Sequence, residues 1–262
     1  MNSQGNYVYS MMRSKLLLIA MLAALTAAAQ DAHHLGIGSS NVLDTYLSQE
    51  KYSGTGLTYL YIRERVKPEK RWMTMAEHEM SFSVGKDRSR QTSMMTGDYN
   101  LYLGRYHRWN LCDNRLQLYA GGAVNATVGF LYTMQNSNNP AQLRASLQIM
   151  PSAIGKYAFT LGKQQFALRY EANLPLVGLA FSPNFGQSYY EIFGRGDYDH
   201  NIVPTTFISA PSFRQLVTLD WKISSRYNLR IGYLGNFQQL QVNNLKQHLY
   251  TQRIILGVVR RL

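Results

Sequence analysis

The feature that most constrains this chain is a strict two-residue alternation that persists over long segments. Between Leu116 and Phe130 every even position is apolar or glycine. The odd positions are small or polar, namely Gln117, Tyr119, Gly121, Ala123, Asn125, Thr127 and Gly129. Successive side chains of a strand point to opposite faces, so this pattern predicts a long β-strand with one apolar face. The uncharged stretch 116–143 also allows a membrane-spanning helix, but its glycines and alternating polar residues favour a strand.

The same alternation recurs along the chain, and each alternating segment ends in a polar turn, as in antiparallel sheets. We therefore expect an all-β fold. The predicted strands are residues 35–41, 54–66, 72–84, 92–108, 114–132, 141–161, 164–180, 211–223, 227–242 and 247–262.

Two folds fit this pattern: a soluble sandwich with an apolar core, and a transmembrane barrel with an apolar outer face. Segments 114–132 and 141–161 exceed ordinary soluble strands and reach the roughly 9–11 residues that cross a bilayer at a tilt. Aromatic residues also stand near strand ends, as in interfacial girdles. They are Trp72, Trp109, Tyr132, Tyr157, Trp221 and Tyr227. The sequence thus predicts an antiparallel transmembrane β-barrel of about ten strands.

The predicted connections alternate between short and long. Tight turns fall at residues 67–71, 110–113, 162–163 and 224–226, and the other connections at 42–53, 85–91, 133–140, 181–210 and 243–246. An even number of strands places both ends of the barrel domain and all short turns on the periplasmic side. The longer loops then face the outside of the cell.

The first 29 residues have the pattern of a cleaved signal peptide. Arg13 and Lys15 precede an apolar run, Leu16–Leu25, and three alanines precede Gln30. The apolar run is about half as long as a membrane-spanning helix. We expect residues 1–29 to be removed on export and residues 30–262 to form a barrel in the bacterial outer membrane.

The charge balance limits the partners of the chain. It has 27 basic and 15 acidic residues, a net charge of +12. A basic protein can bind nucleic acid, but export argues against that partner and favours anionic lipid or polysaccharide surfaces. The expected partners are outer-membrane lipid and the barrel-assembly machinery that reads a final strand, here ending at Leu262. The single cysteine, Cys112, forms no intramolecular disulfide.

Charged residues on the less apolar face of each strand are expected to line the lumen. The candidates are Arg63, Arg65, Glu77, Glu79, Asp98, Arg115, Arg144, Arg169, Glu171 and Arg230. Because a tight turn joins strands 54–66 and 72–84, Arg63 and Glu77 are expected to form an ion pair. These side chains either fill a narrow barrel as paired, hydrogen-bonded groups or form a basic constriction that favours anions. The narrow interior favours the filled lumen.

Residues 181–210 form the most distinctive loop, and long outward loops often carry the function of a barrel. Its candidate binding residues are Tyr189, Tyr190, Phe193, Arg195, Asp197, Tyr198, Asp199 and His200. The aromatic cluster could bind a sugar or a protein, or pack the loop over the barrel mouth. An acid–base set of Asp197, Asp199 and His200 is a weaker alternative, because such a site needs an opposing acidic pair and the sequence offers only Asp87 there.

The remaining patterns do not indicate catalysis. His78 is predicted to lie on the lipid face, where a membrane-embedded hydrolase would need a neighbouring serine, and none stands out. The histidines are scattered without the spacing of metal ligands, and no phosphate-binding loop leads from a strand into a helix. We expect no metal, no cofactor and no enzymatic activity.

Two segments resemble a known family. Leu35–Ser48 (LGIGSSNVLDTYLS) and Asn184–Phe193 (NFGQSYYEIF) are similar to a domain-of-unknown-function family of exported proteins from Bacteroidota. The resemblance extends over nearly all of the predicted mature chain. It implies a host group and a barrel-like fold, and it implies no catalytic residues.

Overall fold

The computed structural model describes residues 28–66, 71–133 and 140–261. The predicted signal peptide, residues 1–29, lies outside the described residues except for its last two positions, which begin the first strand. Within the described ranges, no helix is long and apolar enough to cross a membrane.

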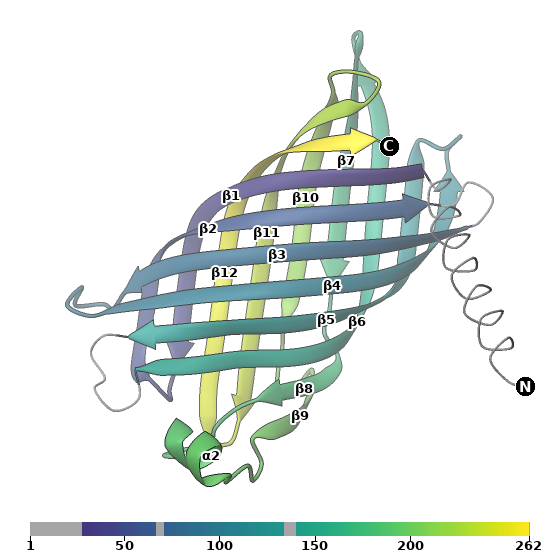
Figure 1. The fold of residues 1–262 in the computed structure, drawn as a ribbon. Coiled ribbons are helices and arrows are strands. Elements are labelled where there is room, and N and C mark those ends of the chain that lie inside the picture. Colours follow the sequence, from purple (N-terminus) through teal and green to yellow (C-terminus); the bar gives the residue numbers. More distant parts are fainter. Residues whose placement is uncertain (1–27, 67–70, 134–139, 262) are drawn as a thin grey trace, which may run out of the picture.

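Ten antiparallel strands close into a barrel (Figure 1), which confirms the predicted fold class. The barrel strands are β1 (Ala28–Asp44), β2 (Ser48–Val66), β3 (Trp72–Lys86), β4 (Ser93–Leu111), β5 (Leu116–Thr133), β6 (Ala141–Leu161), β7 (Gln164–Asn173), β10 (Phe213–Lys222), β11 (Tyr227–Val242) and β12 (Leu245–Arg261). Around the ring they follow the order β5-β4-β3-β2-β1-β12-β11-β10-β7-β6, and pairing of β5 with β6 closes it. Closure leaves no free edge within the ring.

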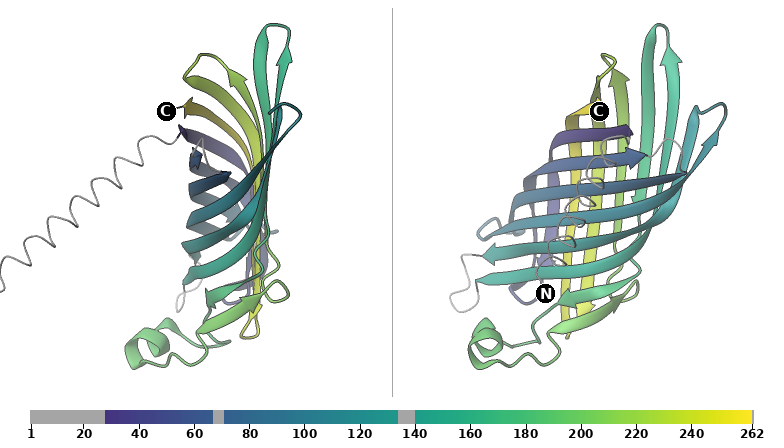
Figure 2. Two further views of the ribbon diagram at one scale, coloured as in Figure 1. Left: turned by 90° about the vertical axis from the view of Figure 1, so that its right-hand side faces the viewer. Right: turned by 45° about the vertical axis from the view of Figure 1, so that its right-hand side comes forward.

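The two ends of the barrel differ. The start of β1, the end of β12 and the β4–β5, β6–β7 and β10–β11 turns lie at one end, here called the turn end. The other end, the loop end, carries the strands β8 (Val177–Phe181) and β9 (Ile202–Thr206) and the helix α2 (Tyr189–Arg195). Figure 2 shows that α2 projects beyond the barrel wall at the end opposite the C-terminus.

One predicted strand and one predicted loop were wrong. The expected strand 164–180 ends at Asn173, because Pro175 has no N–H for a ladder, and the chain resumes as β8 on a different part of β6. The expected loop 42–53 is mostly strand, since only residues 45–47 separate β1 from β2. There the Asp44 carboxylate accepts a hydrogen bond from the Tyr46 N–H at 2.9 Å, which supports a tight turn.

The outer face of the barrel is apolar. Leu35, Leu57 and Leu256 on adjacent strands leave 71%, 61% and 56% of their area exposed. Aromatic side chains near the turn end are also exposed, as expected of an interfacial girdle. These are Trp72, Trp109, Tyr157, Trp221 and Tyr227. In water such a surface would aggregate, whereas in a bilayer it faces lipid.

The interior contains both apolar and charged side chains. Nine of the ten barrel strands contribute to one interior apolar cluster, mainly from their halves next to the turn end. Its members are Ala32, Leu60, Ile62, Met73, Met75, Tyr106, Tyr119, Ile154, Leu216, Leu234, Ile255 and Val259. The lumen is therefore packed with side chains over this level.

Two neighbouring glycines of β5 give a matched test of the strand packing. A Cβ on Gly121 would lie 2.0 Å from the Arg105 carbonyl oxygen of β4, whereas one on Gly122 would have nothing closer than 3.7 Å. We expect Gly121→Ala to lower the free energy of unfolding by about 1–3 kcal/mol, as overpacking does. Gly122→Ala is the control and should stay within about 0.5 kcal/mol. Urea unfolding in lipid vesicles measures both, and equal effects would contradict the packing described.

Candidate functional site

One arginine joins opposite walls of the barrel. Arg214 on β10 lies five strands from β3 in either direction around the ring. Its Nη2 lies 2.6 Å from a Glu77 carboxylate oxygen and its Nε lies 2.9 Å from a Glu79 oxygen, both on β3. Its Nη1 donates to Glu171 of β7 at 3.0 Å, and its guanidinium sits 4.5 Å from the centre of the Tyr102 ring. All three guanidinium nitrogens of Arg214 thus contact carboxylates inside the lumen.

A second arginine makes a similar crossing. Arg169 on β7 forms two ion pairs through Nη2, which lies 2.6 Å from a Glu171 oxygen and 3.1 Å from a Glu64 oxygen of β2, on the opposite wall. Lys156 of β6 also pairs with Glu64. Glu171 therefore links Arg169 to Arg214, and the four residues Arg169, Glu171, Arg214 and Glu77 are each at most 2% exposed. Buried charges are tolerated at this depth because each is paired with its opposite.

Other interior charges contact polar side chains on the same strand or on other strands of the barrel. The Arg230 guanidinium donates two hydrogen bonds, of 2.5 and 2.8 Å, to the Asp220 carboxylate. Arg144 donates to Gln238 at 2.6 Å, next to a small space of about 40 Å³ near the loop end. Asp98 accepts from the Asn100 side chain at 2.7 Å. These contacts pair part of the polar inner face with side chains of the barrel itself.

The structure brings most of the predicted lumen residues together. Those in the interior are Glu77, Glu79, Asp98, Arg144, Arg169, Glu171 and Arg230. Arg115 is not among them, because it lies exposed in the turn before β5, at the turn end. Arg63 and Arg65 lie on the outer face of β2, on the same side as the exposed Leu57.

The expected Arg63–Glu77 ion pair is wrong. In the register of β2 with β3, Glu77 is opposite Ile62, so Arg63 and Glu77 point to opposite faces. Leu60 and Ile62 face inward and pack into the interior apolar cluster, which turns the odd residues of β2 outward. Arg63 instead pairs with Asp31 at 3.3 Å. A rule that polar residues face the lumen therefore fails where the lumen itself is apolar.

Sequence reasoning missed three central residues: Arg214, Glu64 and Lys156. The partners of Arg214 on β3 are separated from it by 135 and 137 residues, so no local pattern signals these contacts. One signal was available for Arg214. It stands six positions before Asp220 on the same strand, and an even spacing places both on one face.

The outer segment, residues 181–210, is a folded structure. Ser188 caps α2, since its Oγ accepts from the Glu191 N–H at 3.2 Å while the Glu191 carboxylate accepts from the Ser188 N–H at 2.7 Å. The hydrogen bonds from the Ser188 N–H and hydroxyl hold the pKa of Glu191 below its ordinary value. Gly196, with φ of 75°, ends the helix in the left-handed conformation that glycine adopts readily.

Polar contacts attach this segment to the barrel. The Tyr189 hydroxyl donates to the Gln142 side chain at 2.8 Å and accepts from the Leu143 N–H at 2.7 Å, both on β6. Asn243, in the β11–β12 turn, donates to the His200 carbonyl oxygen at 2.8 Å. Burial raises the pKa of the Tyr189 phenol, so this anchor stays protonated at neutral pH.

Four other aromatic side chains of the segment are largely exposed, and one of them, Phe193, also stacks on Tyr189 with ring centres 5.9 Å apart. Phe185, Tyr190, Phe193 and Tyr198 form what we call the outer aromatic surface, and each is 59–69% exposed. The Arg195 guanidinium lies 5.6 Å from the centre of the Tyr190 ring. Of the two roles expected for these aromatics, Tyr189 packs against the barrel mouth and the others stay exposed.

The polar candidates of the segment are also on the surface. Asp197 is exposed, and His200 contacts the Asp199 carboxylate at 2.7 Å with both side chains more than three-quarters exposed. Among the residues that the structure describes, no three His, Cys, Asp or Glu side chains gather as metal ligands would.

The cross-barrel ion pairs predict a large stability effect. Replacing Arg214 by methionine leaves the buried carboxylates of Glu77 and Glu79 without their arginine, and we expect a loss of about 3–5 kcal/mol in the free energy of unfolding. Adding Glu77→Gln and Glu79→Gln to Arg214→Met should restore part of that loss, because the charges are removed together. Urea unfolding in vesicles measures it, with the exposed turn substitution Arg226→Met as control. A loss no larger than the control's would contradict the arrangement.

The fold resembles solved outer-membrane barrels. The transport unit of the autotransporter AIDA-I from Escherichia coli aligns with a TM-score of 0.50 and 9% identity over 89% of each chain. The translocator domain of the autotransporter NalP from Neisseria meningitidis aligns with a TM-score of 0.42 and 11% identity over 99% of this chain and 98% of that one. The outer membrane protease OmpT of Escherichia coli aligns with a TM-score of 0.43 and 7% identity over 90% of this chain and 97% of that one. At these identities the likeness concerns the fold alone.

No curated protein sequence matches the chain. A family described as "Protein of unknown function (DUF3316)" matches residues 20–262, nearly the whole sequence. The match agrees with the resemblance to an uncharacterised family drawn from Leu35–Ser48 and Asn184–Phe193. The chain belongs to the DUF3316 family.

Proposed function

We propose that this protein is a non-enzymatic, non-conducting barrel of the bacterial outer membrane that binds a surface ligand through its outer segment. The observation that carries the proposal is the crossing of the lumen by Arg214, which ties β10 to Glu77 and Glu79 on the opposite wall. A channel needs a continuous polar path through the lumen. Here the Arg214 side chain spans that path and is bound to carboxylates on the opposite wall. None of Arg214, Glu77, Glu79 and Glu171 lines either the small space near the loop end or the larger one at the turn end.

The orientation follows the general rule for bacterial barrels. Short turns and both strand termini face the periplasm, and the longer connections face outward. With this orientation α2, β8 and β9 stand on the cell surface (Figure 1). Their position supports a role in contact with molecules outside the cell.

The outer aromatic surface suits a sugar ligand. Flat rings such as Tyr190 and Phe193 can stack on the apolar face of a pyranose, and Arg195 and Asp197 beside them offer polar groups for its hydroxyls. The capped helix and the Tyr189 anchor hold this surface in place before a ligand arrives. Such preorganisation lowers the entropic cost of binding.

Single-channel recording tests the closed lumen. Purified protein refolded into a planar bilayer should give no steady openings above the leak of the bare membrane, because the interior ion pairs and the interior apolar cluster block the path. A general porin in the same bilayer is the positive control. Steady anion-selective openings would overturn the non-conducting part and favour a narrow anion channel. Lipid or peptide turnover that disappears with His78→Ala or His200→Ala would overturn the non-enzymatic part.

Binding to immobilised bacterial and host glycans tests the outer aromatic surface. We expect the protein to bind at least one glycan class and the double variant Tyr190→Ser, Phe193→Ser to bind at least tenfold more weakly, because the stacking rings are gone. Ile208→Ser is the matched control, since Ile208 is also at the loop end and is 91% exposed. Unchanged binding by the double variant, or no glycan bound by the unaltered protein, would count against a sugar-binding role.

A further inference from the structure

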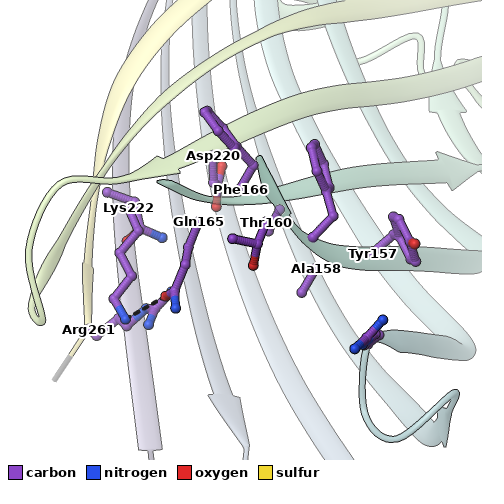
Figure 3. A pocket seen from close by; sticks show the side chains of 12 residues that line it. Tyr157, Ala158, Thr160, Gln165, Phe166, Asp220, Lys222 and Arg261 are labelled. Atoms are coloured by element: carbon purple, nitrogen blue, oxygen red, sulfur yellow. Dashed lines mark hydrogen bonds between the residues drawn. The ribbon is translucent and has the colours of Figure 1, made fainter. Parts of the chain in front are cut away.

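A cavity opens at the turn end, away from the outer segment. It has a volume of about 330 Å³ and is lined by residues from most of the barrel strands. A second cavity of about 550 Å³ lies against the projecting β6–β7 hairpin (Figure 3). The two share Arg115, Asp220, Asn228 and Arg261 in their walls, so they adjoin each other, and we call the pair the vestibule.

The walls of the vestibule are strongly basic. Seven cationic side chains line it, against two carboxylates. The cations are Arg108, Arg115, Lys156, Arg169, Lys222, Arg230 and Arg261, and the carboxylates are Glu64 and Asp220. This leaves five positive charges in excess inside a concave surface. A cleft of one sign with low-dielectric walls concentrates counter-ions within it.

The two carboxylates are already occupied. Glu64 pairs with Lys156 and Arg169, and Asp220 is held by Arg230. The other four cations have no acidic partner within the part of the chain that the structure describes. The Lys222 ammonium donates to the amide oxygen of Gln165 at 2.8 Å, as Figure 3 shows. The unpaired positive charge therefore lies toward the mouth of the vestibule.

The inner wall of the vestibule is also short of acceptors. Arg169 lines it and is 2% exposed, and its Nε and Nη1 have no hydrogen-bond partner in the described part of the chain. Buried donors without acceptors cost free energy and add to the positive potential of the wall. Tyr119, a member of the interior apolar cluster, closes the same wall. A ligand can therefore enter only from the turn end.

We propose that the vestibule is a binding site for a soluble anion that carries at least two phosphate groups. Arginine forks match phosphate oxygens in geometry, and cations on several strands around the hollow suit a ligand with more than one anionic group. In the orientation proposed above, the site faces the periplasm. It is separate from the outer aromatic surface, so either role can fail while the other stands.

Calorimetric titration of the detergent-solubilised full chain with inorganic pyrophosphate tests the site. The protein should bind pyrophosphate, and the affinity should fall as salt rises, because charge pairs near the mouth are screened. The variant Arg115→Glu, Arg261→Glu should bind at least tenfold more weakly. Both side chains are exposed, so the barrel should still fold, which heat-dependent mobility on gels verifies.

Two comparisons make the test specific. Arg226→Glu alters an exposed arginine of another turn at the same end, outside the vestibule walls, and should leave the affinity within twofold. Equal weakening by Arg226→Glu would mean diffuse attraction and would overturn the site. Citrate, which has a similar charge and no phosphate, should bind at least tenfold more weakly than pyrophosphate. Equal citrate binding, or no pyrophosphate binding, would also overturn the proposal.

Discussion

The barrel depends on ion pairs made across its own interior. A closed sheet in a bilayer turns its apolar face to lipid, so polar side chains that alternate with that face have only the lumen to occupy. Arg214 and Arg169 meet carboxylates from the opposite walls, and each such contact fixes the distance between strands far apart in the ring. A barrel of ten strands is narrow enough for arginine and glutamate to span it. The number of strands therefore gives a lumen whose width the paired arginine and glutamate side chains can span.

Strand positions could be predicted from the sequence because burial in lipid demands strict alternation. The expected segments 72–84, 141–161 and 227–242 nearly coincide with β3, β6 and β11. Glu77 and Glu79 were assigned to the lumen for the same reason. The prediction failed at Arg63, where the lumen side of β2 is as apolar as the lipid side, and alternation then carries no information about which face is inside.

The candidate site was harder to predict than the strands. Arg214 has partners on β3 and β7, and only the closed topology brings these strands around it. The outer segment was recognised by its aromatic residues, yet its helix was not expected. The Ser188–Glu191 capping box is a local signal for that helix. The contacts of Tyr189 with β6 decide that this aromatic residue anchors the segment while others remain exposed. Such contacts cannot be predicted from the composition of the segment.

Every strand of the ring is paired on both edges, whereas the hairpin of β8 and β9 leaves one strand edge unpaired. The described sheet ends at β9, which pairs with β8 alone. A free strand edge invites pairing with a strand from another chain. Here the edge strand has only five residues and carries Pro204 at its centre, where the backbone lacks an N–H. This proline shortens the run of donors that a foreign strand could use, and so helps to keep neighbouring copies of the protein apart.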